Sequence, residues 1–235
     1  MKLAVDLHIH SCLSPCASDE MTPNNIVNMA YLKGLNAIAI TDHNSALNLP
    51  AAAAVAKGRG LVLLPGIEVQ SREELHLLCY FPDVDTALEF GGAIYGYLPD
   101  MPNNTDVFGP QSVLDEDDEE VQREPRLLVQ SLSLSMDEVI ALAAQRGGLT
   151  VPAHINRPSY SLLAQLGFMP PHLSFPALEL YEGAPQPKMD LSKYLVFHSS
   201  DSHDLGAILE PSVYIDAESC SARGLLRALQ AGQAG

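Results

Sequence analysis

Leu3-Ala4-Val5-Asp6-Leu7-His8-Ile9-His10 is an apolar run that ends in two histidines spaced two residues apart. The run predicts a buried strand over residues 3–8. Side chains two apart on a strand lie on the same face, so the two imidazoles should lie side by side where this strand ends. His8 and His10 therefore predict half of a metal site, because neutral imidazole is a common metal ligand.

Most of the other histidines also stand close to the end of an apolar segment. They occur in the stretches Ile40-Thr41-Asp42-His43-Asn44, Glu74-Leu75-His76, Pro152-Ala153-His154 and Ser200-Asp201-Ser202-His203. Histidines scattered over a surface would not keep recurring at strand ends, so these residues predict a site built by several strands. His172, in a loop after two prolines, and His198, inside an apolar segment, are expected outside that site.

The length and composition indicate a single domain. The chain has 235 residues, of which 47% are hydrophobic, enough for one large core. There is no apolar run of about 18 residues and no basic segment ahead of an apolar one, so we expect no membrane span or secretory signal and predict a cytoplasmic protein. The four cysteines are irregularly spaced, which fits a reducing compartment. Cys12 and Cys16 lie near the histidine pair, and an incidental position is favoured over a ligand or redox role.

The chain is strongly acidic, with a net charge of −16 from 29 acidic and 13 basic residues. Long nucleic acids bind through many Lys and Arg contacts to phosphates, so the composition predicts no long nucleic acid as a partner. A small anionic substrate is compatible with this charge, because bound cations reverse the local field. The sequence identifies no protein partner.

Strands alternate with helices along most of the chain. The predicted strands are residues 3–8, 37–41, 61–67, 75–80, 149–153, 177–181, 194–199 and 213–215. Most are continuous apolar runs, as expected of parallel strands covered on both faces. The predicted helices are residues 23–33, 47–57, 139–145 and 222–229. Thr22 with Pro23 begins the first, and Ser135 with Glu138 forms a capping box before the third. The alternation predicts an α/β fold, either a barrel or a doubly wound sheet.

Residues 82–134 break this rhythm. They hold several prolines and asparagines, followed by six consecutive acids from Asp115 to Glu120. We favour a solvated insertion on one face of the domain. A cap that shapes substrate access and an element that binds a partner are the alternatives.

The polar motifs fall at one edge of the predicted sheet. The residues concerned follow or end predicted strands and are His8, His10, His43, Glu68, His76, His154, Asp201 and His203. Barrel enzymes place their catalytic groups at the carboxyl ends of strands. Imidazole and carboxylate ligands suit Zn, Mn or Fe, and this many ligands exceeds what one ion uses, so we predict two or three divalent ions.

Taken in order, these motifs resemble the PHP (polymerase and histidinol phosphatase) family of metal-dependent phosphoesterases. The resemblance is carried by Asp-Leu-His-Ile-His-Ser from residue 6, Ile-Thr-Asp-His-Asn from 40, Gly-Ile-Glu-Val from 66, Glu-Leu-His from 74, Ala-His-Ile-Asn-Arg from 153 and Ser-Asp-Ser-His from 200. It spans almost the whole chain apart from residues 82–134. It implies one domain over residues 1–235, a distorted (β/α)7 TIM-like barrel with an acidic insertion and a trinuclear metal centre at its C-terminal mouth.

The resemblance also implies which residues hold the ions. The first ion would be held by His8, His10, Glu68 and Asp201, the second by Glu68, His76 and His154, and the third by His43, His203 and an aspartate. Pro15 stands where that aspartate usually lies, so Asp19 is the expected substitute and Glu20 the alternative. Asp6 and Asp42 are expected to orient the neighbouring ligands rather than to bind metal.

The chemistry expected of such a centre is attack by an activated water on phosphorus, while the cations neutralise charge on the oxygens. Glu68, Asp201 and His203 are the expected catalytic residues, with His203 either a ligand or the acid for the leaving group. Arg157 is expected to clamp the phosphate, since a guanidinium matches two phosphate oxygens. Asn44 and Asn156, within the same motifs, are expected to contact the substrate.

The predicted function is hydrolysis of a small phosphate ester, such as a nucleotide, a nucleoside bisphosphate or a sugar or amino-alcohol phosphate. An exonuclease acting on short oligonucleotides and a non-catalytic, metal-stabilised regulatory module are the alternatives. The nearly complete ligand set argues against the regulatory module. A metal-dependent amidohydrolase shares the opening His-x-His motif, but the few lysines offer no clear counterpart to its carboxylated lysine.

Overall fold

The predicted strands are all present in the computed structural model, which describes residues 1–232. Their bounds are β1 Lys2–Ile9, β2 Ala37–Ile40, β3 Val62–Gln70, β4 His76–Tyr80, β7 Leu149–Pro152, β8 Ala177–Leu180, β9 Leu195–His198 and β10 Tyr214–Asp216. These differ from the predicted ranges by a few residues at most. Continuous apolar runs of this length therefore located the strands correctly.

The helices begin and end where the capping residues indicate. The longer ones are α1 Pro23–Lys33, α2 Leu49–Arg59, α3 Val84–Tyr95, α5 Met136–Ala144 and α7 Ala222–Ala231; α4 Thr105–Phe108, α6 Leu162–Leu166 and the 3-10 helix Leu205–Ala207 are short. The Thr22 side chain caps α1, and Gly34 ends it with a left-handed φ of 84°. Ser135 and Glu138 form the predicted capping box at α5.

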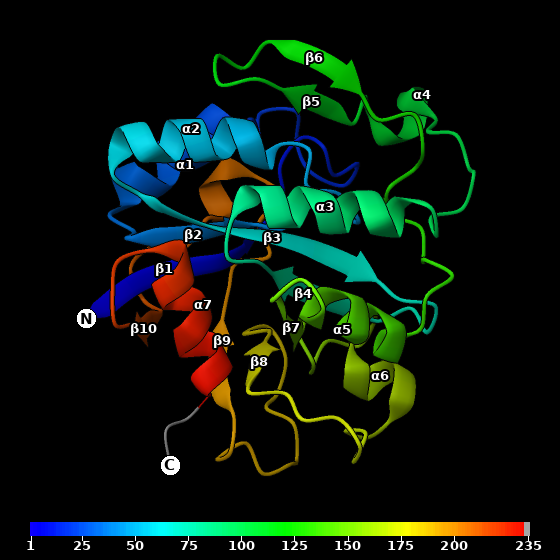
Figure 1. Ribbon diagram of the computed structural model, residues 1–235, viewed down its shortest axis with the longest axis vertical. Coiled ribbons are helices and arrows are strands. Elements are labelled where there is room, and N and C mark those ends of the chain that lie inside the picture. The colour runs from blue at the N-terminus through cyan, green and yellow to red at the C-terminus, as the bar shows by residue number, and fades with distance from the viewer. Residues whose placement is uncertain (233–235) are drawn as a thin grey trace.

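Six strands form one curled sheet in the order β10-β1-β2-β3-β4-β7, and β8 pairs with β9 separately (Figure 1). The α/β class is confirmed, but the described residues form no continuous seven-stranded barrel. The expectation of parallel strands holds for β1, β2 and β3, whereas β4 is antiparallel to both β3 and β7. A tight connection explains this, because Ser71 N–H donates to Leu75 O at 2.9 Å and no crossover helix separates β3 from β4.

Loop hydrogen bonds tie the β8–β9 pair to both sides of the curled sheet. Beyond β7, Ile155 N–H donates to Glu179 O at 3.0 Å. Beyond β9, Ser202 N–H donates to His8 O at 3.2 Å, and His10 N–H donates to Ser202 O at 2.9 Å. The ends of β1, β7, β8 and β9 are therefore brought to one place, although the ladders are not continuous.

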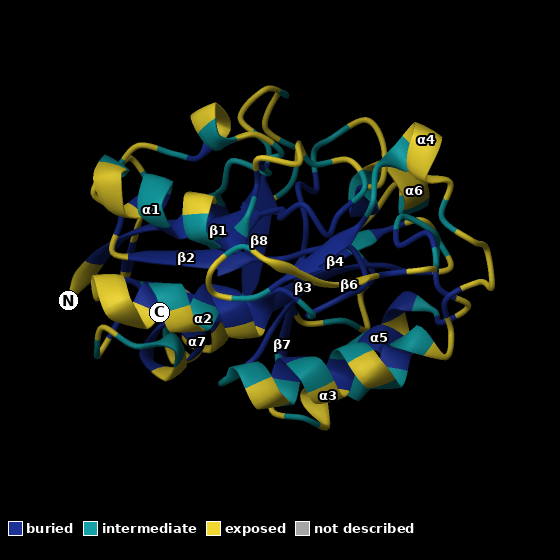
Figure 2. Cartoon of the chain, turned by 90° about the horizontal axis from the view of Figure 1, so that it is seen from above, coloured by how far each residue is buried: buried dark blue, intermediate teal, exposed yellow. Residues whose placement is uncertain are grey.

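The sheet is buried between two apolar cores, and most of the exposed residues lie on the outer helices and loops (Figure 2). One core joins Leu7 to the inner side of α7, and the other joins Ile9 to helices α1, α2 and α3. The register between β1 and β2 shifts between Asp6 and Ile9, which separates Leu7 and Ile9 onto opposite faces. Such an irregularity re-aims the side chains that follow it.

Residues 82–134 divide into a structural part and an excursion. Helix α3 packs on the sheet, with Phe90 fully buried in the main core. After it, α4 and a hairpin of β5 Ser112–Leu114 and β6 Glu120–Arg123 extend to one end of the molecule (top of Figure 1). The acidic run forms the turn of this hairpin. The cap role of the segment stays a prediction.

In the described range, residues 1–232, the structure contains no helix with the length and apolar character that a membrane crossing requires.

Candidate metal centre

Eight predicted ligands converge at one edge of the sheet. They are His8, His10, His43, Glu68, His76, His154, Asp201 and His203. Three sets of side chains place their ligand atoms within 4.8 Å of one another, namely His8 with His10 and Asp201, His43 with Glu68 and His76, and His10 with Cys16, His43 and His203. The predicted convergence of the strand ends is therefore present, and one cysteine joins it.

His76 reaches this edge by a different route from the one predicted. It was expected at a carboxyl end, but it is the first residue of β4. Because β4 runs antiparallel to β3, His76 pairs with Gln70 and its amino end lies at the same edge as the carboxyl end of β3. Its Nε2 lies 3.3 Å from Gln70 Oε1, which leaves Nδ1 facing Glu68 at 2.9 Å.

Glu68 lies at the centre of the cluster and is 1% exposed. Its two oxygens lie 2.9 to 3.4 Å from ring nitrogens of His8, His10, His43, His76 and His154. Within residues 1–232, however, neither oxygen accepts an aligned hydrogen bond, and both ring nitrogens of His154 also lack a partner. Buried polar atoms that converge without hydrogen bonds are costly unless ions occupy the space between them. The donor set therefore fits bound divalent cations.

The charges in the cluster shift its titrations in opposite directions. Burial alone would raise the pKa of Glu68, but the charges of His76 and His8 outweigh it and hold that pKa well below its usual range. Burial lowers the pKa of His43 well below its usual range. Burial would also lower the pKa of His8, yet the carboxylates of Glu179 and Asp201 raise this pKa well above its usual range. A cation bound here would take the place of the His8 proton.

Two ligand residues have a backbone conformation that L-residues seldom adopt. His154 has a φ of 30° and Asp201 a φ of 50°. Neither is glycine or asparagine, and such a backbone conformation costs free energy that surrounding contacts offset, among them Arg157 N–H, which donates to His154 O at 2.8 Å. Each residue comes shortly after a strand, and the strained φ turns its side chain towards the cluster.

Gly66 lets the strands carrying Glu68 and His43 approach each other. A Cβ atom at Gly66 would lie 2.6 Å from Thr41 Cγ2, which is closer than packed atoms come. Just beyond it, Glu68 N–H donates to Thr41 O at 3.2 Å. The absence of a side chain at position 66 therefore allows the end of β2 to close onto β3.

Glu179 is a functional candidate that the sequence reasoning missed. It lies in β8, is 2% exposed, and both of its oxygens are 3.1 Å from His8 Nδ1. A carboxylate only accepts, so Nδ1 carries the proton and Nε2 is left to face the cluster. Glu179 also accepts from His154 N–H at 2.9 Å. The sequence did offer one signal for Glu179, since it is an acidic residue within the otherwise apolar strand Ala177–Leu180.

Asp42 orients the cluster as expected, through Ser14. Ser14 Oγ donates to Asp42 at 2.6 Å and lies 3.1 Å from His10 Nδ1, which therefore donates to it. The same oxygen accepts from His43 N–H at 3.1 Å. Asp6 plays a similar part further back, because it accepts from Ser200 N–H at 3.0 Å.

Asp201, His203 and Arg157 lie together at the open side of the cluster. His203 Nδ1 donates to the Asp201 carbonyl at 2.7 Å, which leaves Nε2 for the cluster. Burial and the nearby charge of His10 lower the pKa of His203 to about 4. Arg157 pairs with the Asp201 carboxylate, and its guanidinium lies 5.0 Å from the centre of the Tyr181 ring.

The structure does not bring Asp19 to the cluster. Asp19 and Glu20 are both exposed, in the turn that is closed by Met21 N–H donating to Ser18 O at 2.9 Å. The turn directs their carboxylates outward. Cys16, for which an incidental position was favoured, lies beside His10, His43 and His203 instead. On the protein groups alone, burial and the charge of Glu68 raise the pKa of its thiol to about 12.

Asn44 and Asn156 hold loops together rather than facing a substrate. Asn44 is 2% exposed, and its side-chain amide donates to Leu128 O at 2.7 Å and Gln130 O at 2.9 Å. Asn156 donates to Tyr181 O at 2.9 Å and accepts from Tyr181 N–H at 2.8 Å. Because backbone groups use both amides, the expected substrate contacts of Asn44 and Asn156 do not match the structure.

A cavity of about 370 Å³ opens over the cluster. Besides ligand residues, its wall is formed by Cys16, Gln70, Val129, Arg157, Ser159 and Tyr160. Tyr160 stacks on the His76 ring with 4.9 Å between centres. A volume of this size suits a small ligand. Val129 comes from the end of the 82–134 segment, so that segment contributes to the mouth of the cavity.

Imidazoles and carboxylates gathered at the edge of an α/β sheet, beneath a cavity with an arginine at its wall, are the side chains that a metal-binding site uses. The chain belongs to the PHP domain family, whose family model matches residues 6–163. The resemblance drawn from the motifs is thereby confirmed.

Two curated relatives match parts of the chain. A 5'-3' exoribonuclease of Haemophilus influenzae is 33% identical over 69 residues, which are 29% of this chain and 24% of the relative. A 3',5'-nucleoside bisphosphate phosphatase of Chromobacterium violaceum is 35% identical over 77 residues, which are 32% of this chain and 26% of the relative. The matched region thus spans only about a quarter of the length of each relative.

Solved structures share the fold at low sequence identity. The lesion-specific endonuclease Q of Pyrococcus furiosus has a TM-score of 0.68 and 22% identity, over 98% of this chain and 56% of that one. A Bifidobacterium adolescentis protein assigned as a metal-dependent phosphoesterase has a TM-score of 0.57 and 21% identity, over 86% of this chain and 88% of that one.

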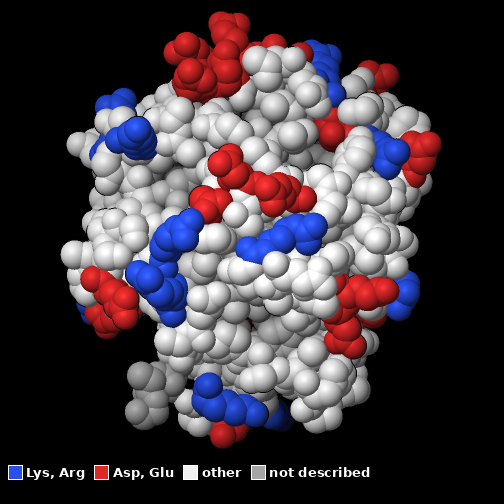
Figure 3. All heavy atoms as spheres, viewed as in Figure 1, with Lys and Arg blue, Asp and Glu red and all other residues white. Residues whose placement is uncertain are grey.

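The exclusion of long nucleic acid as a partner is wrong. Endonuclease Q in complex with a 27-mer duplex has a TM-score of 0.68 and 21% identity, over 98% of this chain and 57% of that one, so this fold accommodates duplex DNA in a neighbour. The exclusion relied on net charge, whereas binding depends on where charges lie. On the face in Figure 3, Lys and Arg lie among the acids, and a dense acidic group gathers at the top, over the β5–β6 turn.

Proposed function

We propose that this chain is a metal-dependent phosphoesterase that hydrolyses a small phosphate ester of the nucleotide, nucleoside bisphosphate, or sugar or amino-alcohol phosphate type. The observation that carries the proposal is a cavity whose floor is a buried carboxylate surrounded by five imidazoles and whose wall holds Arg157. The similarity to a 3',5'-nucleoside bisphosphate phosphatase supports this substrate class.

The family resemblance implies three ion positions. In this proposal His8, His10, Glu68 and Asp201 would hold one ion, Glu68, His76 and His154 a second, and His43 and His203 a third. Glu68 would contribute to the first two, which its position between His8 and His76 supports. When bound, Zn, Mn or Fe ions supply the Lewis acid that activates water and neutralises phosphate charge.

The side chains of the cavity wall bind and orient the substrate. Arg157 donates two N–H groups to non-bridging phosphate oxygens, and the Tyr181 ring beneath its guanidinium holds it in place. Asp201 is paired with Arg157 before substrate binds, so the phosphate takes over part of an interaction that is already formed. If His203, half-buried at the open side, holds no ion, its ring is the alternative group to pass a proton to the leaving oxygen.

A second candidate is cleavage of nucleic acid phosphodiesters. The similarity to a 5'-3' exoribonuclease and the shared fold with endonuclease Q over 98% of this chain favour it. Both candidate functions use the same metal cluster, and they differ in which substrate the mouth of the cavity over it admits. The excursion in residues 82–134 supplies Val129 to that mouth, so it is a candidate determinant of the choice.

The test measures phosphate release from monoesters and bisphosphates, and chain cleavage of oligonucleotides and duplex, by protein reconstituted with Mn, Zn or Fe(II). The substrates are phosphomonoesters, nucleoside bisphosphates, single-stranded oligonucleotides with a 5' phosphate, and a duplex with an abasic site. The inactive control combines His8→Ala with Asp201→Ala. His172→Ala is the matched control, because His172 is exposed and paired only with Asp137.

Turnover of small esters that the double variant loses and His172→Ala keeps would support the first candidate. Cleavage of oligonucleotide or duplex alone would favour the second. Fully metallated protein with no turnover above the double variant on any substrate would refute both.

A further inference from the structure

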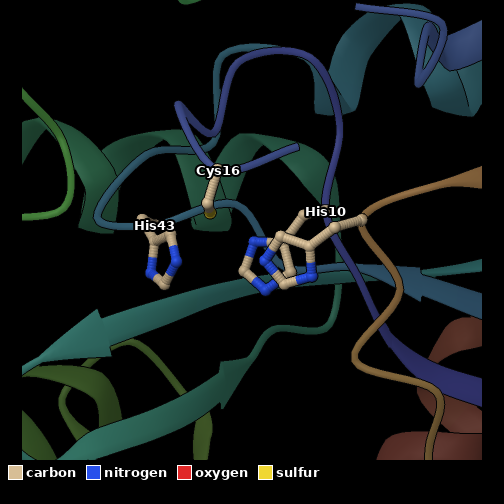
Figure 4. A group of neighbouring side chains, drawn as sticks. His10, Cys16 and His43 are labelled. Carbon is tan, nitrogen blue, oxygen red and sulfur yellow. The ribbon is translucent and has the colours of Figure 1, made fainter. Parts of the chain in front are cut away.

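Cys16 lies against three histidines of the cluster. Its sulfur and one ring nitrogen each from His10, His43 and His203 all lie within 4.8 Å of one another. Figure 4 shows the Cys16 thiol pointing into the gap between the rings of His10 and His43. Because the first ion uses the one free ring nitrogen of His10, the sulfur with His43 and His203 supplies three ligands, as in metal sites that keep a fourth position for water.

Hydrogen bonds on the far side of two rings leave the required nitrogens facing that space. His10 Nδ1 donates to Ser14 Oγ at 3.1 Å, and His203 Nδ1 donates to Asp201 O at 2.7 Å. Each ring therefore presents Nε2 to the cluster. The His43 side chain is 7% exposed, and its Nδ1 has no hydrogen-bond partner within residues 1–232. A buried ring nitrogen without a hydrogen-bond partner indicates that the His43 side chain binds an ion.

The backbone holds Cys16 between two ligand-bearing segments. Ala17 N–H donates to Ser14 O at 2.9 Å, and the side chain of Ser14 contacts His10. On the other side, Ser18 N–H donates to His203 O at 2.9 Å. The turn that carries Cys16 is therefore fixed to His10 at one end and to His203 at the other.

We propose that Cys16 is a thiolate ligand of the third ion and completes that site with His43 and His203, while the one free ring nitrogen of His10 stays with the first ion. The inference deepens the proposed metal centre and rests on it. Coordination forms a sulfur–metal bond and releases the thiol proton to solvent. Asp19, expected in this role, is exposed and does not reach the space. A thiolate is softer than a carboxylate, so this position favours Zn over Mn.

The test is cobalt substitution followed by absorption spectroscopy, because a thiolate bound to Co(II) gives a near-ultraviolet charge-transfer band that imidazole and carboxylate do not. Wild-type protein is expected to show the band. Cys16→Ser and Cys16→Asp are expected to lose it, while Cys16→Asp keeps the bound cobalt. Cys220→Ser is the matched control, since Cys220 is exposed and outside the cluster, and it should keep the band.

Alkylation of the wild-type protein provides a measurement that needs no variant. Zn is expected to protect Cys16 from iodoacetamide, as read by peptide mass spectrometry, and to leave Cys220 reactive. Bound cobalt without the band, or complete alkylation of Cys16 in the presence of bound Zn, would overturn the assignment of Cys16 but leave the phosphoesterase proposal standing. A failure to bind any cobalt or zinc would overturn both. A band with no phosphate release would support Cys16 and count against the enzyme.

Discussion

Replacement of Glu179 by glutamine would test a buried carboxylate that acts through a ligand. Both oxygens of Glu179 lie 3.1 Å from His8 Nδ1, and one of them accepts from His154 N–H at 2.9 Å. Both groups that face the Glu179 carboxylate, His8 Nδ1–H and His154 N–H, are hydrogen-bond donors. The ionised carboxylate therefore fixes the proton on Nδ1 of His8 and leaves Nε2 as the ligand atom.

The glutamine amide places an N–H₂ group where an oxygen now accepts. His8 is then free to move its proton to Nε2, which removes the lone pair from the cluster. The loss of such an orienting partner costs about 10- to 100-fold in metal affinity, which corresponds to about 1.4 to 2.7 kcal/mol. The lost negative charge weakens proton binding at His8 as well as cation binding, so protons compete less with the cation in the variant, and we expect a smaller loss of affinity at low pH than at high pH.

Competition for Zn with a fluorescent chelator measures this affinity directly. Glu182→Gln is the matched control, because it makes the same change of charge three residues away on an exposed side chain. We expect Glu182→Gln to bind Zn as the wild type does. Unchanged affinity in Glu179→Gln, in protein that folds normally by circular dichroism, would refute the role assigned to Glu179.

Two further substitutions and a change of pH have expected effects that follow from the structure. Arg157→Ala should lower kcat/KM for a phosphate ester about 10- to 100-fold, with Arg157→Lys intermediate, because a lysine keeps the charge but not the two-pronged contact. Gly66→Ala should lower the free energy of unfolding by about 1 to 3 kcal/mol in urea titrations, since the new Cβ would meet Thr41 at 2.6 Å, whereas Gly58→Ala, in open space, should not. In chelator, the free energy of unfolding of the wild type should fall by about 1 kcal/mol more than that of His203→Gln from about pH 7 to about pH 5, because the pKa of His203 is about 4 in the folded protein and about 6.5 in an unfolded chain, which therefore binds that proton more tightly.

Different results would contradict these expectations. Equal kcat/KM for Arg157→Ala and wild type would place the phosphate elsewhere in the cavity. Equal losses in Gly66→Ala and Gly58→Ala would mean that the close approach of β2 and β3 is not what position 66 provides. The same pH dependence of stability in wild type and His203→Gln between about pH 7 and about pH 5 would contradict the burial assigned to the His203 ring.

The strands of the curled sheet, the β8–β9 pair and four of the five longer helices were predictable because their signals are local, whereas α3, in the segment favoured as a solvated insertion, was not predicted. Apolar runs mark the strands, and the caps Thr22, Gly34 and Ser135 mark helix ends, all of which depend on residues close together in sequence. The direction of β4 was not predictable in the same way. It follows from a tight turn between β3 and β4, which the reading of the chain as a parallel barrel did not consider.

The same division holds at the metal centre. The amino-acid sequence was sufficient to single out eight histidine and carboxylate side chains, since their chemistry and their placement near strand ends are both readable along the chain. Three assignments needed the folded chain: Glu179 stands behind His8, Cys16 turns inward, and Asp19 turns outward. Which way a side chain faces depends on strand direction, on a register shift and on loops closed by hydrogen bonds between segments far apart in sequence. These long-range contacts cannot be deduced from the residue types alone.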